Sequence, residues 1–222
     1  MTDAHYHRNE FETFLSVQGA EYRFGGFHPW QVGVVPDLTS ALADLHSCIA
    51  ADARLGVGEI GLDRLRTKTI PDVQRTALAA QLAFAAELGR PVVLHGAKCW
   101  GEVVKACTPH KDRIPAFLFH GFSRSAGLLP EIVALNGFVS VGPALLNDHA
   151  VNYREMVREL PLDRIVLETD KDWGVALEDG APSQEALLTS LAHALSDLRK
   201  CPLETLVSAL DANTARFVEA LA

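Results

Sequence analysis

The sequence predicts an α/β fold built as a TIM-like (β/α) barrel, either seven-stranded or incompletely closed. Short apolar runs alternate with longer segments of helical spacing, a rhythm typical of parallel β-α-β units. The apolar runs are continuous, as expected for strands that a parallel sheet buries on both faces. Several of them end in a histidine or a carboxylate, at the strand end where barrels gather their catalytic groups.

The first part of the chain has the least regular pattern. Thr2–His7 is expected to form the first strand. Glu10–Val17 is expected to form a short helix, because Phe11, Phe14 and Leu15 keep helical spacing. Seven strands are expected in all, starting near residues 2, 22, 55, 91, 116, 137 and 164.

The later helices have clearer limits. Asp72–Leu88 is the best defined, because Pro71 precedes it and Gly89 and Pro91 follow it. Helices are also expected over residues 38–52, 100–107, 125–135, 149–160, 183–198 and 203–221, the last broken around 211–213. A chain of 222 residues with this pattern fits one domain, residues 1–222. A doubly wound open sheet is the competing architecture, although no Gly-rich phosphate loop follows the first strand to support its nucleotide-binding form.

Composition places the chain among ordinary globular proteins. Hydrophobic residues make up 48% of it and charged residues 22%. No apolar run is long enough to span a bilayer and no signal-peptide pattern opens the chain, so a cytoplasmic location without membrane contact is expected. The net charge of −8 argues against a broad nucleic-acid-binding surface but leaves room for a small anion pocket. The four cysteines form no C-x-x-C pair and are expected to be free thiols.

Two histidines, His5 and His7, end the first strand. Side chains two residues apart on a strand point to the same face, so the two imidazoles can converge on one point. Imidazole is a common ligand for zinc, manganese and iron. A His-x-His pair alone is weak evidence, and it gains weight from the residues that end later strands.

Four further donors follow later strands: Glu59, His95, His120 and Asp170. Together with the histidine pair they offer six nitrogen or carboxylate ligands at one rim, enough for one or two divalent ions, with Glu59 as a bridging carboxylate. Asp170 is then well placed to orient a water molecule and take its proton. We therefore expect all six residues to bind metal, and Asp170 and Glu59 to be catalytic.

Each of the four later donors also has a purely structural interpretation. His95 or His120, taken singly, is more often a hydrogen-bonded core histidine than a ligand. Glu59 could cap a helix from a loop, and Asp170 could be an N-cap. The joint pattern is harder to explain in this way, because five different strands end with such a residue. His28 also lies at a strand end, and its role is ambiguous.

Longer motifs surround these residues. They are D-A-H-Y-H at Asp3–His7, G-E-I-G-L-D at Gly58–Asp63, P-V-V-L-H at Pro91–His95, H-G-F-S at His120–Ser123, L-E-T-D at Leu167–Asp170, and Asn213 with Arg216 and Phe217. In order and approximate spacing they resemble the TatD-type metal-dependent deoxyribonucleases along nearly the whole chain. The combination of G-E-I-G-L-D with L-E-T-D is the most specific part of this resemblance.

The resemblance implies a fold, an activity and residue roles. The family consists of amidohydrolase-like barrels that hydrolyse phosphodiester bonds with divalent metals, which implies one or two Zn, Mn or Mg ions and a DNA or other phosphodiester substrate. It implies that the six donors are metal ligands. His28 matches a G-x-H-P turn beside the substrate. Asp63 matches a carboxylate that supports the site from the pocket edge, and it is expected to bind the substrate as well. Lys98 is expected to replace a missing arginine at the substrate, and Arg124 to border the substrate as well.

This chain departs from the family pattern where the family contacts substrate. Between His7 and His28 the family usually has a longer helix and an additional strand, so a gap or a rearranged seam is expected in the barrel. Arg64 stands where an aromatic residue usually follows G-L-D, and Arg124 where a glycine follows H-G-F-S. Lys171–Gly174 replaces a small residue and a proline, and a later Arg-Asn pair is missing. The metal chemistry is therefore better supported than the DNA substrate.

Three functions fit these observations. The first is a metal-dependent phosphodiesterase with a local cationic rim, although each rim residue can equally be an ordinary surface charge. The residues of this rim are Arg64, Arg66, Lys68, Lys98, Arg124 and Lys171. The second is the same metal centre hydrolysing a phosphomonoester, an amide or an ester. The third is a non-catalytic metal-binding protein, against which the retained Asp170 speaks, because a structural site needs no base.

Overall fold

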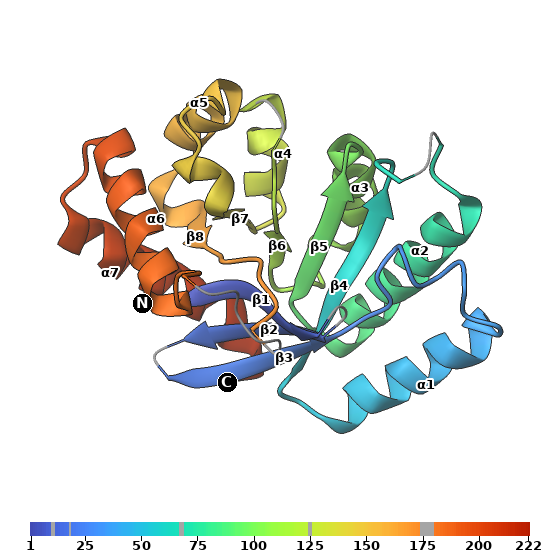
Figure 1. Ribbon diagram of the computed structural model, residues 1–222. Helices are drawn as coiled ribbons and strands as arrows, with labels where there is room; N and C mark the ends of the chain where they lie inside the picture. Colours follow the sequence, from blue (N-terminus) through green and yellow to red (C-terminus); the bar gives the residue numbers. More distant parts are fainter. Residues whose placement is uncertain (10–11, 18, 67–68, 124–125, 174–179) are drawn as a thin grey trace.

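In the part of the chain that the structure describes, eight strands form one curved sheet that helices surround on the outside (Figure 1). The computed structural model describes residues 1–9, 12–17, 19–66, 69–123, 126–173 and 180–222. The strands are β1 (Asp3–Asn9), β2 (Glu12–Val17), β3 (Ala20–Gly25), β4 (Leu55–Asp63), β5 (Val92–Ala97), β6 (Phe117–Phe119), β7 (Gly137–Val141) and β8 (Ile165–Leu167). The helices are α1 (Leu38–Ala51), α2 (Asp72–Leu88), α3 (Trp100–Cys107), α4 (Leu129–Ala134), α5 (Val151–Glu159), α6 (Gln184–Arg199) and α7 (Leu203–Val218). The expected TIM-like α/β barrel is confirmed.

The strands follow one another in chain order around the sheet. From β3 to β8 neighbouring strands run parallel, whereas β1, β2 and β3 pair antiparallel as a meander. The sheet is therefore mixed. Because five consecutive parallel pairings hold β3 to β8, the carboxyl ends of these strands meet at one rim.

The strand count of seven was one short, because residues 12–17 form β2 and not part of a helix. Both faces of β2 are covered: Phe14 stacks on Tyr6 at a ring distance of 5.8 Å, while Leu15 enters the barrel core. Consecutive apolar residues therefore imitate helical spacing here. Residues 12–17 form a strand because they pair with β1 and β3 on either side, and the spacing of apolar residues within the segment does not reveal this pairing.

The barrel is nearly closed. The segment that follows β8 runs beside β1, where the backbone N–H of His7 donates to Lys171 O at 2.8 Å and that of Trp173 donates to His7 O at 2.8 Å. The N–H of Asp170 donates to His5 O at 3.1 Å. These bonds join the first strand to the last functional motif. Where the sequence predicted a gap or a rearranged seam, between His7 and His28, β2 and β3 form an antiparallel meander with β1.

The interior of the barrel holds a separate apolar cluster. Phe217 at the end of α7 lies between Phe24 of β3 and Phe138 of β7, at ring distances of 5.8 and 6.0 Å. Leu15 and Val166 belong to the same buried cluster. A larger cluster packs the outer faces of the strands against the helices. Burying both faces of the strands in this way explains their continuous apolar runs.

Most helix limits follow from local signals. The Asp37 carboxylate accepts from Ser40 N at the start of α1, and Ser183 accepts from Ala186 N at the start of α6. Gly89 ends α2 in the left-handed conformation, as predicted. The break expected around residues 211–213 is absent, because the Asn213 amide donates to two backbone carbonyls near β8 and leaves α7 continuous.

Candidate metal centre

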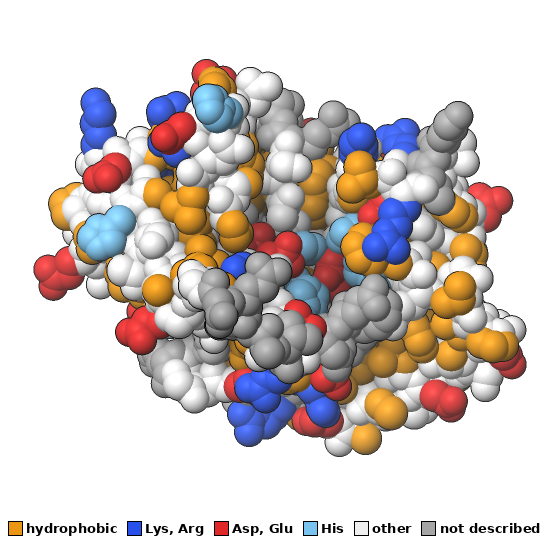
Figure 2. All heavy atoms as spheres, in the orientation of Figure 1, with side chains coloured by type: hydrophobic (Ala, Val, Ile, Leu, Met, Phe, Trp, Pro, Cys, Tyr) orange, Lys and Arg blue, Asp and Glu red, His pale blue; other side chains and the backbone are white. Residues whose placement is uncertain are grey.

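The six predicted donors come together at one rim of the barrel. Three sets of metal-compatible ligand atoms lie there, each within 4.8 Å: His5, His120 and Asp170; His5, His7 and Glu59; and His28, Glu59 and His95. Figure 2 shows histidine and acidic side chains at the bottom of a hollow on this face of the molecule. Residues separated by more than 160 positions in the chain thus share one site.

The first group of donors surrounds a point between β1 and the end of β8. Nε2 of His5 lies 3.2 Å from Nε2 of His7, 3.5 Å from Glu59 Oε2 and 3.5 Å from Asp170 Oδ1. Nε2 of His7 lies 4.0 Å from Glu59 Oε2 and 3.5 Å from Asp170 Oδ1. Ligands about 2.0–2.2 Å from a tetrahedral ion stand about 3.3–3.6 Å from one another. The spacing of this group fits a divalent ion.

The second group uses the other oxygen of Glu59. Oε1 lies 2.7 Å from His95 Nδ1, 2.8 Å from His120 Nε2 and 3.4 Å from His28 Nε2. Nδ1 of His95 and Nε2 of His120 are 3.4 Å apart. Glu59 therefore presents one carboxylate oxygen to each group, which is the geometry of a bridging ligand.

Local glycine geometry lets β4 and β5 bring Glu59 and His95 together. Gly61 has φ +155°, and a Cβ atom at this position would lie 2.0 Å from the backbone oxygen of His95. Any side chain would push the two strands apart. All nine residues of β4 are buried, so Glu59 is fixed in a packed strand and not in a loop.

His95 and His120 of the second group each have a supporting carboxylate. Asp63 Oδ2 lies 3.0 Å from His95 Nε2 and accepts from Trp30 Nε1 at 2.7 Å. Glu168 Oε2 lies 3.6 Å from His120 Nδ1, and its Oε1 accepts from Gly121 N at 2.9 Å. Carboxylates in this position fix the tautomer and the ring orientation of a ligand.

Sequence reasoning missed Asp3 and Glu168. Asp3 is fully buried, and it accepts from Thr169 N, Thr169 Oγ1 and Gln184 Nε2 at 3.0, 2.7 and 2.7 Å. It therefore anchors the segment that carries Asp170 to the first strand. Burial raises the pKa of Asp3 to about 6, an effect that these hydrogen bonds partly offset. Acidic residues inside the D-x-H and E-T-D motifs were the available signal.

The carboxylates and histidines of the site shift one another's pKa values. Burial alone would raise the pKa of Glu59, but the charge and hydrogen bonds of His120 and the neighbouring histidines hold it well below its usual range. Burial alone would lower the pKa of His120, but Glu59 and Asp170 raise it well above its usual range. The pKa of Asp170 is likewise lowered by His120 and the β1 histidines, against the effect of burial. The site is thus a set of ionised carboxylates that attracts positive charge.

The predicted substrate residues lie at different depths. His28 is buried within the second donor group, and Lys98 is exposed just after β5, in a left-handed conformation with φ 57°. Asp63 is 1% exposed, so its contacts favour positioning of His95 over contact with a substrate. Arg124 and the rim residue Lys68 lie outside the described residues.

Two cavities open beside Asp170. One of about 190 Å³ is lined by His95, Trp100, His120 and Ser123 among others. The other, of about 360 Å³, is lined by Tyr153, Glu168 and Lys171 among others. Both also include Gly121, Ser123 and Asp170 in their walls, so together they extend the hollow on one side of the donors.

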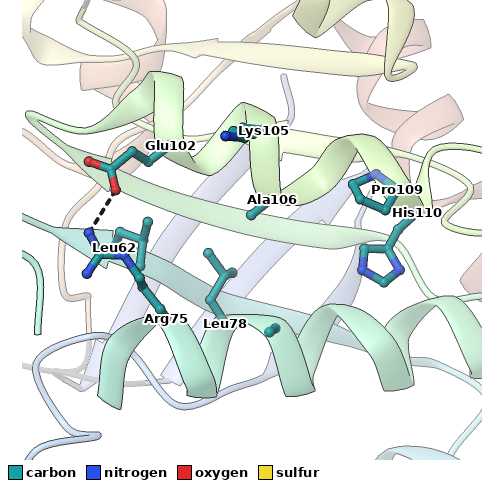
Figure 3. A pocket seen from close by; sticks show the side chains of 9 residues that line it. Leu62, Arg75, Leu78, Glu102, Lys105, Ala106, Pro109 and His110 are labelled. Carbon is teal, nitrogen blue, oxygen red and sulfur yellow. Dashed lines mark hydrogen bonds and ion pairs between the residues drawn. The ribbon is translucent and has the colours of Figure 1, made fainter. Parts of the chain in front are cut away.

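A larger groove of about 510 Å³ lies elsewhere, between α2 and α3 (Figure 3). Arg75 and Glu102 form an ion pair at one end of it, with 3.0 Å between Nη2 and Oε2. Leu78, Ala106 and Pro109 supply apolar walls. None of the six donors lines this groove. The metal donors therefore lie beside smaller cavities and not beside this larger one.

Comparison with known proteins supports the geometry. The family model described as TatD related DNase matches residues 2–219. The chain belongs to the TatD-related DNase family. It is 31% identical over 146 residues to a protein of Pectobacterium carotovorum named 3'-5' ssDNA/RNA exonuclease TatD, covering 65% of this chain and 55% of that protein. It is 25% identical over 193 residues to the uncharacterized metal-dependent hydrolase YabD of Bacillus subtilis, covering 86% of this chain and 75% of that protein.

Solved structures agree with this placement. The TatD homologue YjjV from Escherichia coli aligns over 88% of this chain and 76% of its own, with a TM-score of 0.76 and 27% identity. A TatD-family hydrolase from Entamoeba histolytica aligns over 86% of this chain and 72% of its own, with a TM-score of 0.68 and 14% identity, which shows the shared fold. The resemblance to the TatD-type family that the sequence motifs indicate is thus confirmed. In the part of the chain that the structure describes, no helix is long and apolar enough to cross a membrane.

Proposed function

We propose that residues 1–222 form one domain that hydrolyses phosphodiester bonds in DNA with one or two divalent ions. The observation that carries this proposal is the position of Glu59 between two groups of donors. One oxygen faces His5 and His7, and the other faces His95 and His120. A purely structural histidine cluster needs no bridging carboxylate with an acid beside it.

The donor set fits hard or borderline divalent ions. Nitrogen and carboxylate ligands suit zinc, and manganese and magnesium accept sites rich in carboxylate. His5, His7, Glu59 and Asp170 would hold one ion, and Glu59, His95 and His120 a second. When bound, such ions lower the pKa of a water molecule and polarise a phosphoryl oxygen.

We assign to Asp170 the role of general base, which accepts a proton from the attacking water molecule. Its side chain is 41% exposed, far more than the 6% of Glu59, so it meets solvent while touching the donor groups. Its lowered pKa keeps the carboxylate ionised and able to accept a hydrogen bond from an attacking water molecule. Asp63, Glu168 and Asp3 keep the donors and the Asp170 segment in place.

The substrate assignment rests on charge and on relatives. Lys171 lines the 360 Å³ cavity beside Asp170, and Lys98 is exposed after β5. Both can attract phosphate near the carboxylates, as can Arg124 by its place in the sequence. Relatives bear the name ssDNA/RNA exonuclease, and the alignment with one of them spans 55% of that protein's length. We therefore propose that His28, Lys98 and Arg124 bind the substrate.

Asp170→Asn tests the proposal. With manganese or magnesium, we expect the variant to keep the fold and most bound metal and to hydrolyse a single-stranded oligonucleotide about 10²- to 10⁴-fold more slowly, the usual contribution of a general base. Asp112→Asn, an exposed substitution, serves as the matched control and keeps wild-type activity. Equal rates for Asp170→Asn and wild type would defeat the assigned role.

A substrate panel tests the bond. The wild-type protein is compared on bis(4-nitrophenyl) phosphate, 4-nitrophenyl phosphate, a carboxylic ester and an amide. We expect metal-dependent hydrolysis of the phosphodiester to be the fastest. A preference for the monoester, the ester or the amide would keep the metal centre and reject the phosphodiesterase assignment.

A further inference from the structure

A tryptophan and an arginine stack on each other at the edge of the metal centre. Trp30 follows the His28-Pro29 turn, and Arg66 follows β4. The guanidinium carbon of Arg66 lies 3.4 Å from the centre of the Trp30 ring. Two loops from neighbouring strands thus meet in a flat aromatic and cationic stack beside the site.

The stack is held rigidly on its inner side. Trp30 Nε1 donates to Asp63 Oδ2 at 2.7 Å, and the Trp30 ring meets those of His28 and His95 edge to face at 4.6 and 5.9 Å. Asp63 in turn accepts from the backbone N–H groups of Leu65 and Arg66 at 2.6 and 3.0 Å. The indole is therefore fixed in orientation by the same carboxylate that orients His95.

The outer side of the stack faces solvent. Arg66 is exposed, Trp30 is half-buried, and the neighbouring Leu65 is 61% exposed. Among the described residues, no carboxylate forms an ion pair with the Arg66 side chain. Figure 2 shows hydrophobic and basic side chains together immediately beside the histidine-lined hollow. A cavity of about 210 Å³ borders Trp30 and Arg66.

We propose that the Trp30–Arg66 stack binds an unpaired nucleobase of the substrate next to the scissile phosphodiester. This inference rests on the proposed phosphodiesterase function and adds a site for the base. Aromatic rings and guanidinium planes both stack on nucleobases, and the Arg66 charge also attracts the adjoining phosphate. A duplex would keep its bases paired and unavailable to such a surface, so the stack favours single strands.

The experiment is a double-mutant cycle between protein and substrate. A fluorescein-labelled single-stranded oligonucleotide is prepared intact and with one abasic nucleotide at each position in turn. Binding is measured by fluorescence anisotropy with manganese present, in the Asp170→Asn background so that the oligonucleotide stays whole. The variants Trp30→Leu, Trp30→Phe, Arg66→Gln and Arg66→Lys are compared in that background.

The expected result is a penalty that depends on Trp30. Stacking is worth about 1–3 kcal/mol per base, so one abasic position should weaken binding roughly 5- to 150-fold. In the Trp30→Leu protein, the same abasic position should weaken binding by less than about 2-fold, because the stacking partner of the base is already lost. If Trp30 and the base acted independently, their effects would add and the full penalty would remain. Trp30→Phe should retain the penalty, because the aromatic face is kept.

The Arg66 variants separate stacking from charge and do not disturb a buried position. Arg66→Lys keeps the charge and loses the plane, so it should lose the abasic penalty to the same extent as Arg66→Gln. Arg158→Gln, an exposed substitution on α5, is the control and should retain the full penalty. Thermal unfolding of each variant checks that the fold is kept.

Two outcomes overturn the inference. If the abasic nucleotide weakens binding equally in the Trp30→Leu variant and in the protein that keeps Trp30, another surface holds the base. The absence of oligonucleotide binding would also reject the subsite. Hydrolysis of bis(4-nitrophenyl) phosphate by the wild-type protein is measured in parallel, because its loss would reject the phosphodiesterase function, whereas the binding cycle decides the base site separately.

Discussion

At the scale of single residues, the site is built from donors that are each oriented by a neighbour. Asp63 orients His95, Glu168 faces His120, and Asp3 anchors the segment that carries Asp170. The sequence could predict the donors themselves, because histidine and carboxylate at strand ends suggest metal chemistry. It could not predict which carboxylates support them, because Glu168 and Asp170 are two residues apart and only their side-chain directions separate their roles.

Glu168→Gln tests the role of a supporting carboxylate. Nδ1 of His120 and Oε2 of Glu168 are buried, and neither has a hydrogen-bond partner within 3.5 Å among the described residues, so they depend on each other at 3.6 Å. Loss of the charge should weaken divalent-metal affinity about 10- to 100-fold, as measured by chelator competition. Glu159→Gln, exposed at the end of α5, should leave affinity unchanged. Unchanged affinity in Glu168→Gln would show that His120 needs no such support.

Metal binding should release protons. In the metal-free protein the pKa of His120 is raised well above its usual value, mainly by Glu59 and Asp170 against burial, so His120 holds a proton near neutral pH. A cation that uses this imidazole must displace that proton, and its affinity should therefore rise with pH by about tenfold per pH unit for each proton displaced. Calorimetric titrations in buffers of different ionisation enthalpy count the protons. Zero release at pH 7 would contradict a neutral His120 ligand.

At the scale of elements, the parallel strands bring distant residues to one rim, and the meander of β1 to β3 closes the barrel in a different way. The sequence predicted the parallel part well, because β4 to β8 are short, mostly apolar runs, and four of these five strands have a histidine or a carboxylate within two residues of their end. It failed at β2, where burial of Phe14 and Leu15 on opposite faces removes the alternation that marks a strand. Only the neighbouring strands supply that information.

The close approach of β4 and β5 can be tested at Gly61. Gly61→Ala places a Cβ atom 2.0 Å from His95 O at a φ of +155°, so it should destabilise the protein by about 2 kcal/mol or more. Gly101→Ala in α3 meets no atom within 4 Å and should stabilise the helix by up to about 1 kcal/mol. Urea unfolding compares the two. Equal stability of both variants would mean that the two strands separate at little cost.

At the scale of the whole molecule, the barrel joins the beginning and the end of the chain at the same site. His5 and Asp170 meet because β1 runs beside the segment after β8, through backbone hydrogen bonds that the sequence alone does not predict. The family motifs gave the expected ligand set and the barrel class. The Trp30–Arg66 stack could not be foreseen, because it depends on the paths of two loops whose sequences show no common pattern.

The central claim is that donors from five strands hold divalent cations in one pocket. An anomalous difference map from manganese-loaded crystals, recorded near the manganese absorption edge, tests it most directly. We predict one or two peaks, one among His5, His7, Glu59 and Asp170 and the other among Glu59, His95 and His120. A map whose peaks all lie outside these donors, or one without a peak among them, would contradict the claim.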